Sequence, residues 1–395
     1  MKNTPRHSAR AAVAAYLTIT ALFTALFVSQ ACAAQGESDE YALFGRRIVA
    51  DLSGGDARAF GDAIDKEALI ARVMEGVPQD SKAMGELREG LMAGLDRVGA
   101  MVTGNLGENA LLTFVRHRRM EGGDYALVRI DYGEKGLNYL DFVLRKNAAG
   151  AVKIIDWHDY AQGQLYTASL RQAIALLIPQ DRTLFEKLLG VDGLDKKEAK
   201  QFVELARLLR EKDFSGWLKK YDSLSEKMKS SRILLVTHVL AASASGDNEQ
   251  YRLALGDVRN HLGDDPTLSL VLIDYYFYEE DYRAAQRALE RMTGYTGGDA
   301  AIDHLRANIY LAAKNYADSI RYARKAIEED AAYEDSYWTL LDASVLTGQY
   351  QEAVGVIGQL ETRFGYEFDP AKLAEIDGYE GFAESSAFAE WKGVR

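Results

Sequence analysis

The chain has 395 residues, of which 48% are hydrophobic and 27% are charged, and it carries one cysteine and five prolines. These proportions are typical of a folded globular protein and exclude a disordered chain, a collagen-like chain and a disulfide framework. The net charge of −12 repels phosphate groups, so it argues against nucleic acid and anionic membrane surfaces as partners.

Residues 1–34 have the layout of a secretory signal peptide. Three basic residues lie within the first ten, residues 11–29 carry no charge, and the small residues 31–34 offer an A-x-A cleavage site. We expect the chain to be exported, to the periplasm or as a secreted protein. Cleavage would also remove Cys32, the lone cysteine, which is compatible with an oxidising compartment.

Two alternatives for this segment stay open. As a helix, its uncharged run would be about 28 Å long, enough to anchor the chain in a membrane if the segment is retained. Cys32 would instead be acylated in a lipoprotein, although Ser29 stands where that signal prefers leucine. Membrane contact is expected only if the segment is retained or Cys32 is lipidated.

Residues 35–180 are predicted to form an α+β domain. Helical periodicity runs through 40–65, 66–76 and 81–102, and from residue 109 the period changes to two. Four strand-like runs follow, at 110–119, 125–133, 137–146 and 151–160, and a last helix covers 165–178. Helices followed by four consecutive strands with short connections predict a four-stranded antiparallel sheet.

Two short motifs stand in this domain: Gly55, Asp56 and Ala59 in its early helical part, and Lys153, Ile155 and Asp156 in its last predicted strand. Together they resemble the nuclear-transport-factor-2-like (cystatin-like) fold. In that fold an N-terminal helix carries a GD-x-x-A turn and the last strand reads K-x-I-x-D. The resemblance implies a conical pocket that can hold a small ligand.

The strands supply three candidate catalytic residues, Asp141, Asp156 and His158. Asp156 and His158 are two residues apart, so they lie on one side of their strand. If Asp141 meets them across neighbouring strands, an acid–base pair or a metal site is geometrically feasible. The alternative is a solvated sheet face on which Arg129 or Arg145 pairs with Asp141.

The C-terminal half contains a 34-residue repeat. Tyr282, Tyr316 and Tyr350 are each 34 residues apart, and a small residue follows three positions after each of them. Helix, turn and helix at this period resemble the tetratricopeptide repeat (TPR). We expect an all-α solenoid of about five helical hairpins over 195–366, with degenerate copies around Phe214 and Tyr251, and capping helices over 367–395.

The TPR resemblance also implies where a partner would bind. In TPR proteins the first helix of each hairpin lines a concave surface, which takes a protein or peptide. Asn308 matches the asparagine of the type that grips C-terminal carboxylates, but the basic residues that complete such a clamp are absent. The alternative is that several of the aromatic residues pack in the core. The implied partner-binding residues are Leu270, Asp274, Phe277, Tyr278, His304, Asn308, Trp338 and Asp342.

Common catalytic motifs are absent from the sequence. It has no H-E-x-x-H, no phosphate-binding G-x-x-x-x-G-K-[ST], no G-x-S-x-G and no cysteine pair, so no metal or cofactor is expected. The sequence therefore predicts an exported, non-enzymatic interaction or scaffold protein, with cell-envelope assembly as one setting. The alternative is a small-ligand-binding protein or acid–base enzyme that uses a pocket in the α+β domain.

Overall fold

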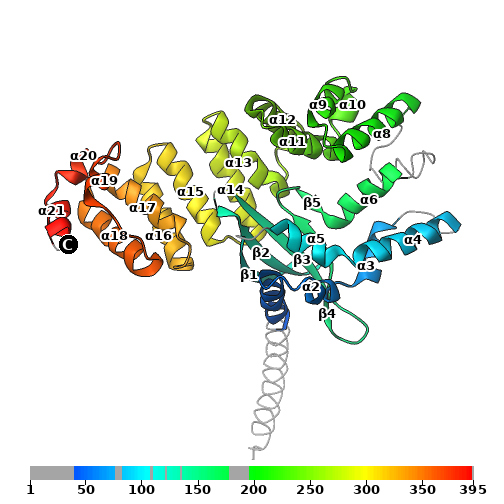
Figure 1. The fold of residues 1–395 in the computed structure, drawn as a ribbon, viewed down its shortest axis with the longest axis horizontal. Coiled ribbons are helices and arrows are strands. Elements are labelled where there is room, and N and C mark those ends of the chain that lie inside the picture. Colours follow the sequence, from blue (N-terminus) through cyan, green and yellow to red (C-terminus); the bar gives the residue numbers. More distant parts are fainter. Residues whose placement is uncertain are drawn as a thin grey trace, which may run out of the picture. The chain divides into compact units, whose positions relative to one another are not determined.

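The computed structural model describes residues 40–75, 82–106, 110–120, 122–133, 136–177 and 195–393 (Figure 1). The predicted leader, 1–34, lies outside the described residues. The chain divides into two compact units. The first ends at His158 and also includes Leu165–Thr167, and the second comprises Asp159–Gln164 and the chain from Ala168 onward. Among the described residues, no helix combines the length and apolar character needed to cross a membrane.

The first unit contains helices followed by an antiparallel sheet, as predicted. Residues 40–53 are helical. The strands pair in the order β1-β2-β3-β4-β5, and a bulge interrupts β1 between Phe114 and Arg116. The short fifth strand was not predicted, because two residues cannot show a period. The elements are α2 (Ala57–Ala63), α3 (Lys66–Val73), α4 (Lys82–Leu95), α5 (Val98–Leu106), β1 (Leu111–Met120), β2 (Gly123–Asp131), β3 (Leu137–Lys146), β4 (Val152–Asp159) and β5 (Gln164–Leu165).

An aromatic cluster forms the core on one face of this sheet. Phe60 of α2 contacts Phe142 of β3 and Trp157 of β4, with ring centroids 5.9 and 6.5 Å away, and Phe60 is fully buried. Side chains alternate along a strand, so the neighbours of these residues in sequence, including Asp141 and Asp156, point to the opposite face.

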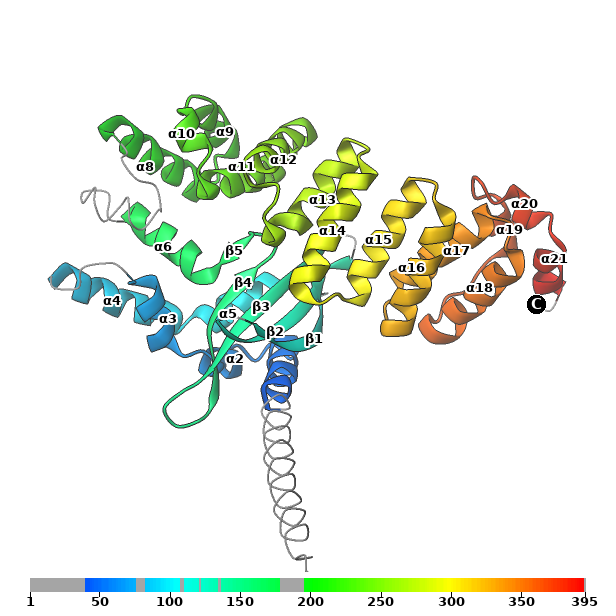
Figure 2. The ribbon, with the colours of Figure 1, turned by 180° about the vertical axis from the view of Figure 1, so that it is seen from behind.

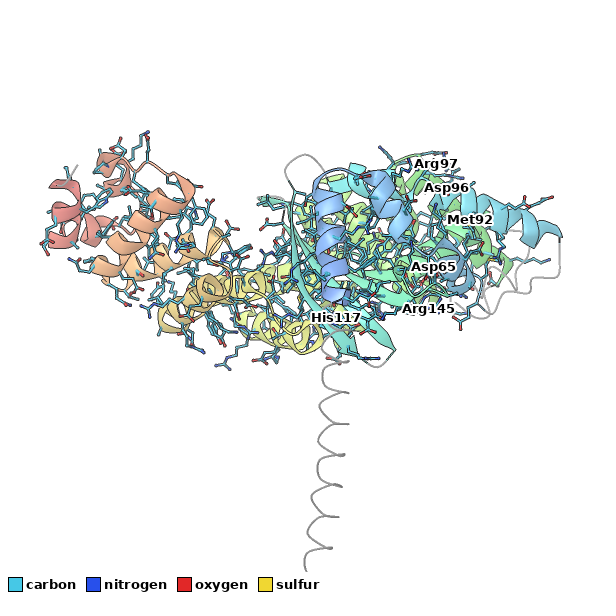
Figure 3. All side chains as sticks on the ribbon, turned by 90° about the horizontal axis from the view of Figure 1, so that it is seen from below. Asp65, Met92, Asp96, Arg97, His117 and Arg145 are labelled. Carbon is cyan, nitrogen blue, oxygen red and sulfur yellow. The ribbon has the colours of Figure 1, made fainter. Side chains whose placement is uncertain are left out.

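Polar contacts fix the helices of this unit. Asp56 caps α2 by accepting a hydrogen bond from the backbone N–H of Ala59 at 2.9 Å. Lys153 Nζ of β4 donates to the carbonyl of Asp62 at 2.6 Å, which ties β4 to α2. Figure 2 shows the strands and α2 of this unit from behind. Just after α4, Asp96 accepts a hydrogen bond from Lys66 Nζ at 2.6 Å (Figure 3). Asp56 and Lys153 of the two sequence motifs therefore stabilise helix ends.

The second unit is an array of helical hairpins of the TPR type, as predicted. Figure 1 shows α13 to α18 as successive antiparallel pairs side by side. One short helix, α10 (Glu226–Lys229), interrupts the connection between the first two hairpins, and α6 (Tyr166–Leu177) precedes the array. The hairpins are α8 (Lys196–Arg210) with α9 (Phe214–Asp222), α11 (Arg232–Ser245) with α12 (Asn248–Leu262), α13 (Ser269–Tyr278) with α14 (Tyr282–Thr296), α15 (Ala300–Ala312) with α16 (Tyr316–Glu329), and α17 (Asp335–Leu346) with α18 (Tyr350–Phe364).

The turn inside each hairpin keeps a strict 34-residue period. One residue per turn has a positive φ, between 52° and 74°, and the second helix begins two residues later. The register expected from Tyr251 is therefore wrong, because the residue equivalent to Tyr282 is Asn248. These turn residues are Lys212, Gly246, Glu280, Lys314 and Gly348.

At four of the five turns, the residue after the turn position explains why the second helix starts there, while Gln349 at the fifth turn makes no side-chain cap. Asp213, Asp247, Asp281 and Asn315 each accept a hydrogen bond from a backbone N–H in the first turn of that helix. Such a cap satisfies a donor that the helix itself leaves free, and it contributes about 1 kcal/mol.

The C-terminal segment packs on the last hairpin. It contains α19 (Pro370–Ala374), α20 (Glu380–Ala383) and α21 (Ser386–Gly393). A short 3-10 helix, η2 (Pro266–Leu268), lies elsewhere in the array, immediately before α13. Tyr379, Phe382 and Phe388 are buried in one cluster with Tyr337 of α17 and Ile357 of α18. The segment thus covers apolar surface that a further repeat would otherwise cover.

Candidate functional site

The helix α13 presents four predicted binding residues on one side. Their spacing places them along a single face of the helix. On the opposite face Leu272, Ile273 and Tyr276 are buried. Phe277 and Tyr278 are 37% and 47% exposed, which is unusual for aromatic side chains of this size. The four residues are Leu270, Asp274, Phe277 and Tyr278.

Neighbouring tyrosines hold this face of α13 in place. The Tyr251 hydroxyl of α12 donates to Asp274 Oδ2 at 2.9 Å, and the Tyr251 ring packs edge-on against Tyr278 with centroids 6.4 Å apart. Phe277 makes a similar edge contact with Tyr282 at 6.0 Å. The two exposed rings are therefore supported from behind, which lowers the entropy lost when a partner binds them.

Two further exposed residues occupy equivalent positions in other hairpins. In the 34-residue register Leu240 of α11 corresponds to Asp274, and Leu346 of α17 corresponds to Tyr278. They are 58% and 44% exposed. Neither leucine was among the binding residues predicted from the sequence, although the 34-residue spacing of Asp213, Asp247 and Asp281 reveals the register of the repeat. We call Leu240, Phe277, Tyr278 and Leu346 the first-helix set.

His304 and Asn308 are engaged with each other and with the next hairpin. Asn308 Nδ2 lies 2.9 Å from His304 Nε2, the Thr339 hydroxyl donates to Asn308 Oδ1 at 2.6 Å, and His304 Nδ1 lies 3.4 Å from Thr339 Oγ1. These three contacts close a ring when His304 carries its proton on Nδ1. The ring links α15 to α17.

Burial keeps His304 neutral. The side chain is 7% exposed, and desolvation lowers its pKa from 6.5 to about 4. A neutral imidazole has one donor and one acceptor nitrogen, as the ring with Asn308 and Thr339 requires. His304 therefore carries no charge near neutral pH with which to attract a carboxylate.

The chain's own C-terminal segment covers Trp338. The rings of Tyr366 and Phe368 lie 5.0 and 5.7 Å from the indole, and the indole N–H donates to Glu334 Oε1 at 3.2 Å. The Tyr366 hydroxyl donates to the same carboxylate oxygen. Trp338 is thus half-buried by residues that follow α18 in the sequence.

Asp342 is also engaged by the C-terminal segment. The hydroxyl of Tyr379, which is itself buried, donates to Asp342 Oδ1 at 2.5 Å. Burial raises the pKa of Asp342, and the hydrogen bond from Tyr379 partly opposes that shift. The predicted binding residues of the last hairpin therefore face the chain's own end.

In the sheet, Asp141 pairs with an arginine that was not anticipated. Arg118 of β1 donates to Asp141 Oδ2, and the carboxylate is 1% exposed rather than solvated. Burial raises the pKa of Asp141 and the charge of Arg118 lowers it, with burial the larger effect. Its other oxygen, Oδ1, is buried and accepts no hydrogen bond from the described residues.

Asp156 has a different set of partners. It is fully buried and accepts hydrogen bonds from the backbone N–H groups of Trp157 and Thr167, from the Thr167 hydroxyl at 2.6 Å, and from Arg72 Nε at 3.1 Å. This arrangement ties β4 to α3 and to the start of α6. His158, two residues further along β4, is buried. Within the described ranges no cluster of three or more His, Cys, Asp or Glu is placed to hold a metal ion.

The two carboxylates thus serve separate ion pairs. Asp141 is paired across the sheet from β3 to β1, and Asp156 joins β4 to helices. An acid–base pair needs both groups directed at one reacting atom, and each of these carboxylates already has an arginine partner. The arrangement supports a structural function for both residues.

No protein-family model matches the chain, and neither does any curated protein. A solved structure of MamA from Desulfovibrio magneticus RS-1 is 16% identical, with 45% of this chain and 100% of that chain covered and a TM-score of 0.36.

Two other solved structures show similar values. YrrB, described as a TPR protein with an unusual peptide-binding site, is 12% identical, covers 42% of this chain and 85% of its own, and has a TM-score of 0.32. The TPR2AB domain of yeast Sti1 in its pHSP90 complex is 14% identical over 55% and 98%, with a TM-score of 0.25. The TPR character of the array is seen directly in its 34-residue helical hairpins.

Proposed function

We propose that this chain is an exported, non-enzymatic scaffold whose array of helical hairpins binds a protein or peptide. The observation that carries the proposal is the exposure of the first-helix set. Four large apolar side chains occupy equivalent faces of α11, α13 and α17 and are 37% to 58% exposed. Contiguous exposed apolar surface marks interaction sites in soluble proteins, and the adjacent rings of Phe277 and Tyr278 are the part of the set that fits this description.

The chemistry of α13 suits a protein partner. Phe277 and Tyr278 offer two adjacent aromatic rings, and aromatic residues contribute most to the affinity of protein interfaces. Asp274 beside them is an acceptor that orients a partner's donor group. The predicted leader over 1–34 supports export, which belongs to the same proposal.

Crosslinking the full chain in its native envelope, followed by mass spectrometry, tests location and partner together. The double change Phe277→Ala and Tyr278→Ala should reduce partner recovery about tenfold or more, because each ring is worth about 1–2 kcal/mol or more at an interface centre. Leu253→Ala is the matched control, since Leu253 is 46% exposed but lies on α12, a second helix.

Two outcomes would refute the proposal. One is equal recovery of partners by the parent chain and the double variant while Leu253→Ala reduces it. The other is a chain that stays inside the cell with residues 1–34 intact. Circular dichroism of each variant confirms that lost binding does not reflect lost folding.

A further inference from the structure

An open cavity lies between two neighbouring second helices of the array. It has a volume of about 610 Å³, within the range of ligand sites, and is bounded by the end of α12, the loop after it, α13 and α14 as far as Arg291. Tyr276 of α13 and Ala284 of α14 are buried residues of its wall. None of the residues predicted to bind a partner lines it.

Three arginines line this cavity without a carboxylate partner among the described residues. Arg259 lies near the end of α12, and Arg287 and Arg291 occupy successive turns of α14. Arg287 is exposed. Arg291 Nη2 donates to the carbonyl of Gly263 at 3.1 Å, while its Nε is buried and donates no hydrogen bond. Arg259 Nη1 donates to the side-chain oxygen of Asn260 at 3.1 Å. Guanidinium groups without a carboxylate partner present planar donors that match carboxylate oxygens.

Two of the three acidic residues in the lining have other roles. Asp265 pairs with Arg232 and accepts hydrogen bonds from Thr267, and these contacts lower its pKa overall despite its burial. Asp281 caps α14 through the N–H of Ala284 at 2.9 Å. Of the three aspartates in the lining, Asp264 is the one without such a role, and its side chain is exposed. The lining holds three arginines and three aspartates, and Arg232, which pairs with Asp265, adds a fourth positive charge, so the local net charge is +1 in a chain of net charge −12.

The spacing of the arginines indicates the form of the ligand. Side chains at i and i+4 of a helix, such as Arg287 and Arg291, have Cβ atoms about 5–6 Å apart. In an extended segment, residues i and i+2 point to the same side about 6.5–7 Å apart. Acidic side chains at alternate positions would therefore meet the two arginines in turn. The cavity is also much larger than a single oxyanion.

We propose that this cavity binds an extended segment with acidic residues at alternate positions, supplied by the protein partner. The inference rests on the proposed function and adds a second, electrostatic site on the second helices. It would select for charge, whereas the first-helix set selects for apolar surface. Both sites together would make binding depend on two separate features of one partner.

Fluorescence anisotropy with a labelled synthetic peptide of alternating Glu and Ser tests the cavity directly, using the full chain. Arg287→Gln with Arg291→Gln should weaken binding about tenfold or more, because two charge-assisted contacts are lost. Arg363→Gln is the control, since Arg363 is exposed on α18, outside the cavity. Raising the salt concentration should weaken the parent's binding as well.

The results separate this inference from the proposed function. Phe277→Ala with Tyr278→Ala should leave binding of the Glu–Ser peptide unchanged while it reduces capture of the envelope partner. Equal peptide binding by the arginine variant, no binding even at low salt, or displacement by equimolar inorganic phosphate would each overturn the acidic-segment site. If the double variant unfolds, the single change Arg287→Glu at an exposed position repeats the test.

Discussion

His304 shows how one buried polar residue joins two repeats. Its ring nitrogens meet Asn308 in its own helix and Thr339 in the next hairpin. Removing either partner would leave a buried polar group without a hydrogen bond, which costs about 1–3 kcal/mol. The contact therefore contributes to the interface between α15 and α17 rather than to a free binding surface.

Acid should weaken the array through this histidine. The pKa of His304 is about 4 in the folded chain and about 6.5 in the unfolded chain, so the unfolded chain binds more protons between these values. Stability is fully present above about pH 6.5 and falls toward pH 4, by roughly 2–3 kcal/mol from this residue. Urea unfolding at both pH values measures it. His304→Gln should show a smaller loss, and an equal loss in both chains would contradict the assignment.

Sequence alone placed His304 and Asn308 on the right helix but could not show what they contact. Thr339, which completes the ring, lies 31 residues beyond Asn308, and Tyr366 and Phe368 lie about 30 residues beyond Trp338. Such contacts between distant residues leave no periodic pattern in the chain. The exposed pair Phe277 and Tyr278 was predicted because the TPR resemblance places both on the face of the first helix that lines the concave surface.

At the scale of the element, the hairpin turn is the most regular feature of the array, because its position repeats every 34 residues. In four of the five turns a residue with positive φ is followed by a capping side chain, and these pairs recur at 34-residue intervals. The helices and the antiparallel strands were predictable from periodicity. The register of the second hairpin was not, because Tyr251 was aligned with Tyr282, whereas the cap Asp247 is the informative position.

Two glycines of the last hairpin should respond in opposite ways to alanine. Gly348 has φ of +72° at the turn, so Gly348→Ala should cost about 1 kcal/mol. Gly355 lies inside α18, and an added Cβ there meets no atom within 4 Å. Gly355→Ala should therefore stabilise the chain by about 0.5–1 kcal/mol. Thermal unfolding compares the two, and shifts of the same sign would exclude this explanation.

At the scale of the whole molecule, stability should be distributed between neighbouring repeats. Each hairpin packs mainly on the next, so the array behaves as a series of coupled units rather than one core. The end of the series is covered by the C-terminal segment, in which Phe382 is 1% exposed. Residues of that segment form one buried cluster with Tyr337 and Ile357 of the last hairpin.

Phe382→Ala should loosen the end of the array first. Removing a buried phenylalanine costs about 3–5 kcal/mol, and the loss falls on the hairpin that the segment covers. Hydrogen exchange should speed up in α17 and α18 while α11 and α12 keep their protection. The exposed Tyr278→Ala is a suitable control. Uniform loss of protection along the array would show that it unfolds as a single unit.

The constant turn spacing has a consequence for how the array can change in length. A cut from one turn residue to the next removes 34 residues, which comprise the second helix of one hairpin and the first helix of the next: joining Glu280 to Asn315 places a capping asparagine where Asp281 stood. An excision or duplication of 34 residues at this point keeps a turn residue beside a capping residue, whereas another length would separate them. Gene-level duplication can therefore lengthen or shorten the array in steps of two helices without breaking this pairing.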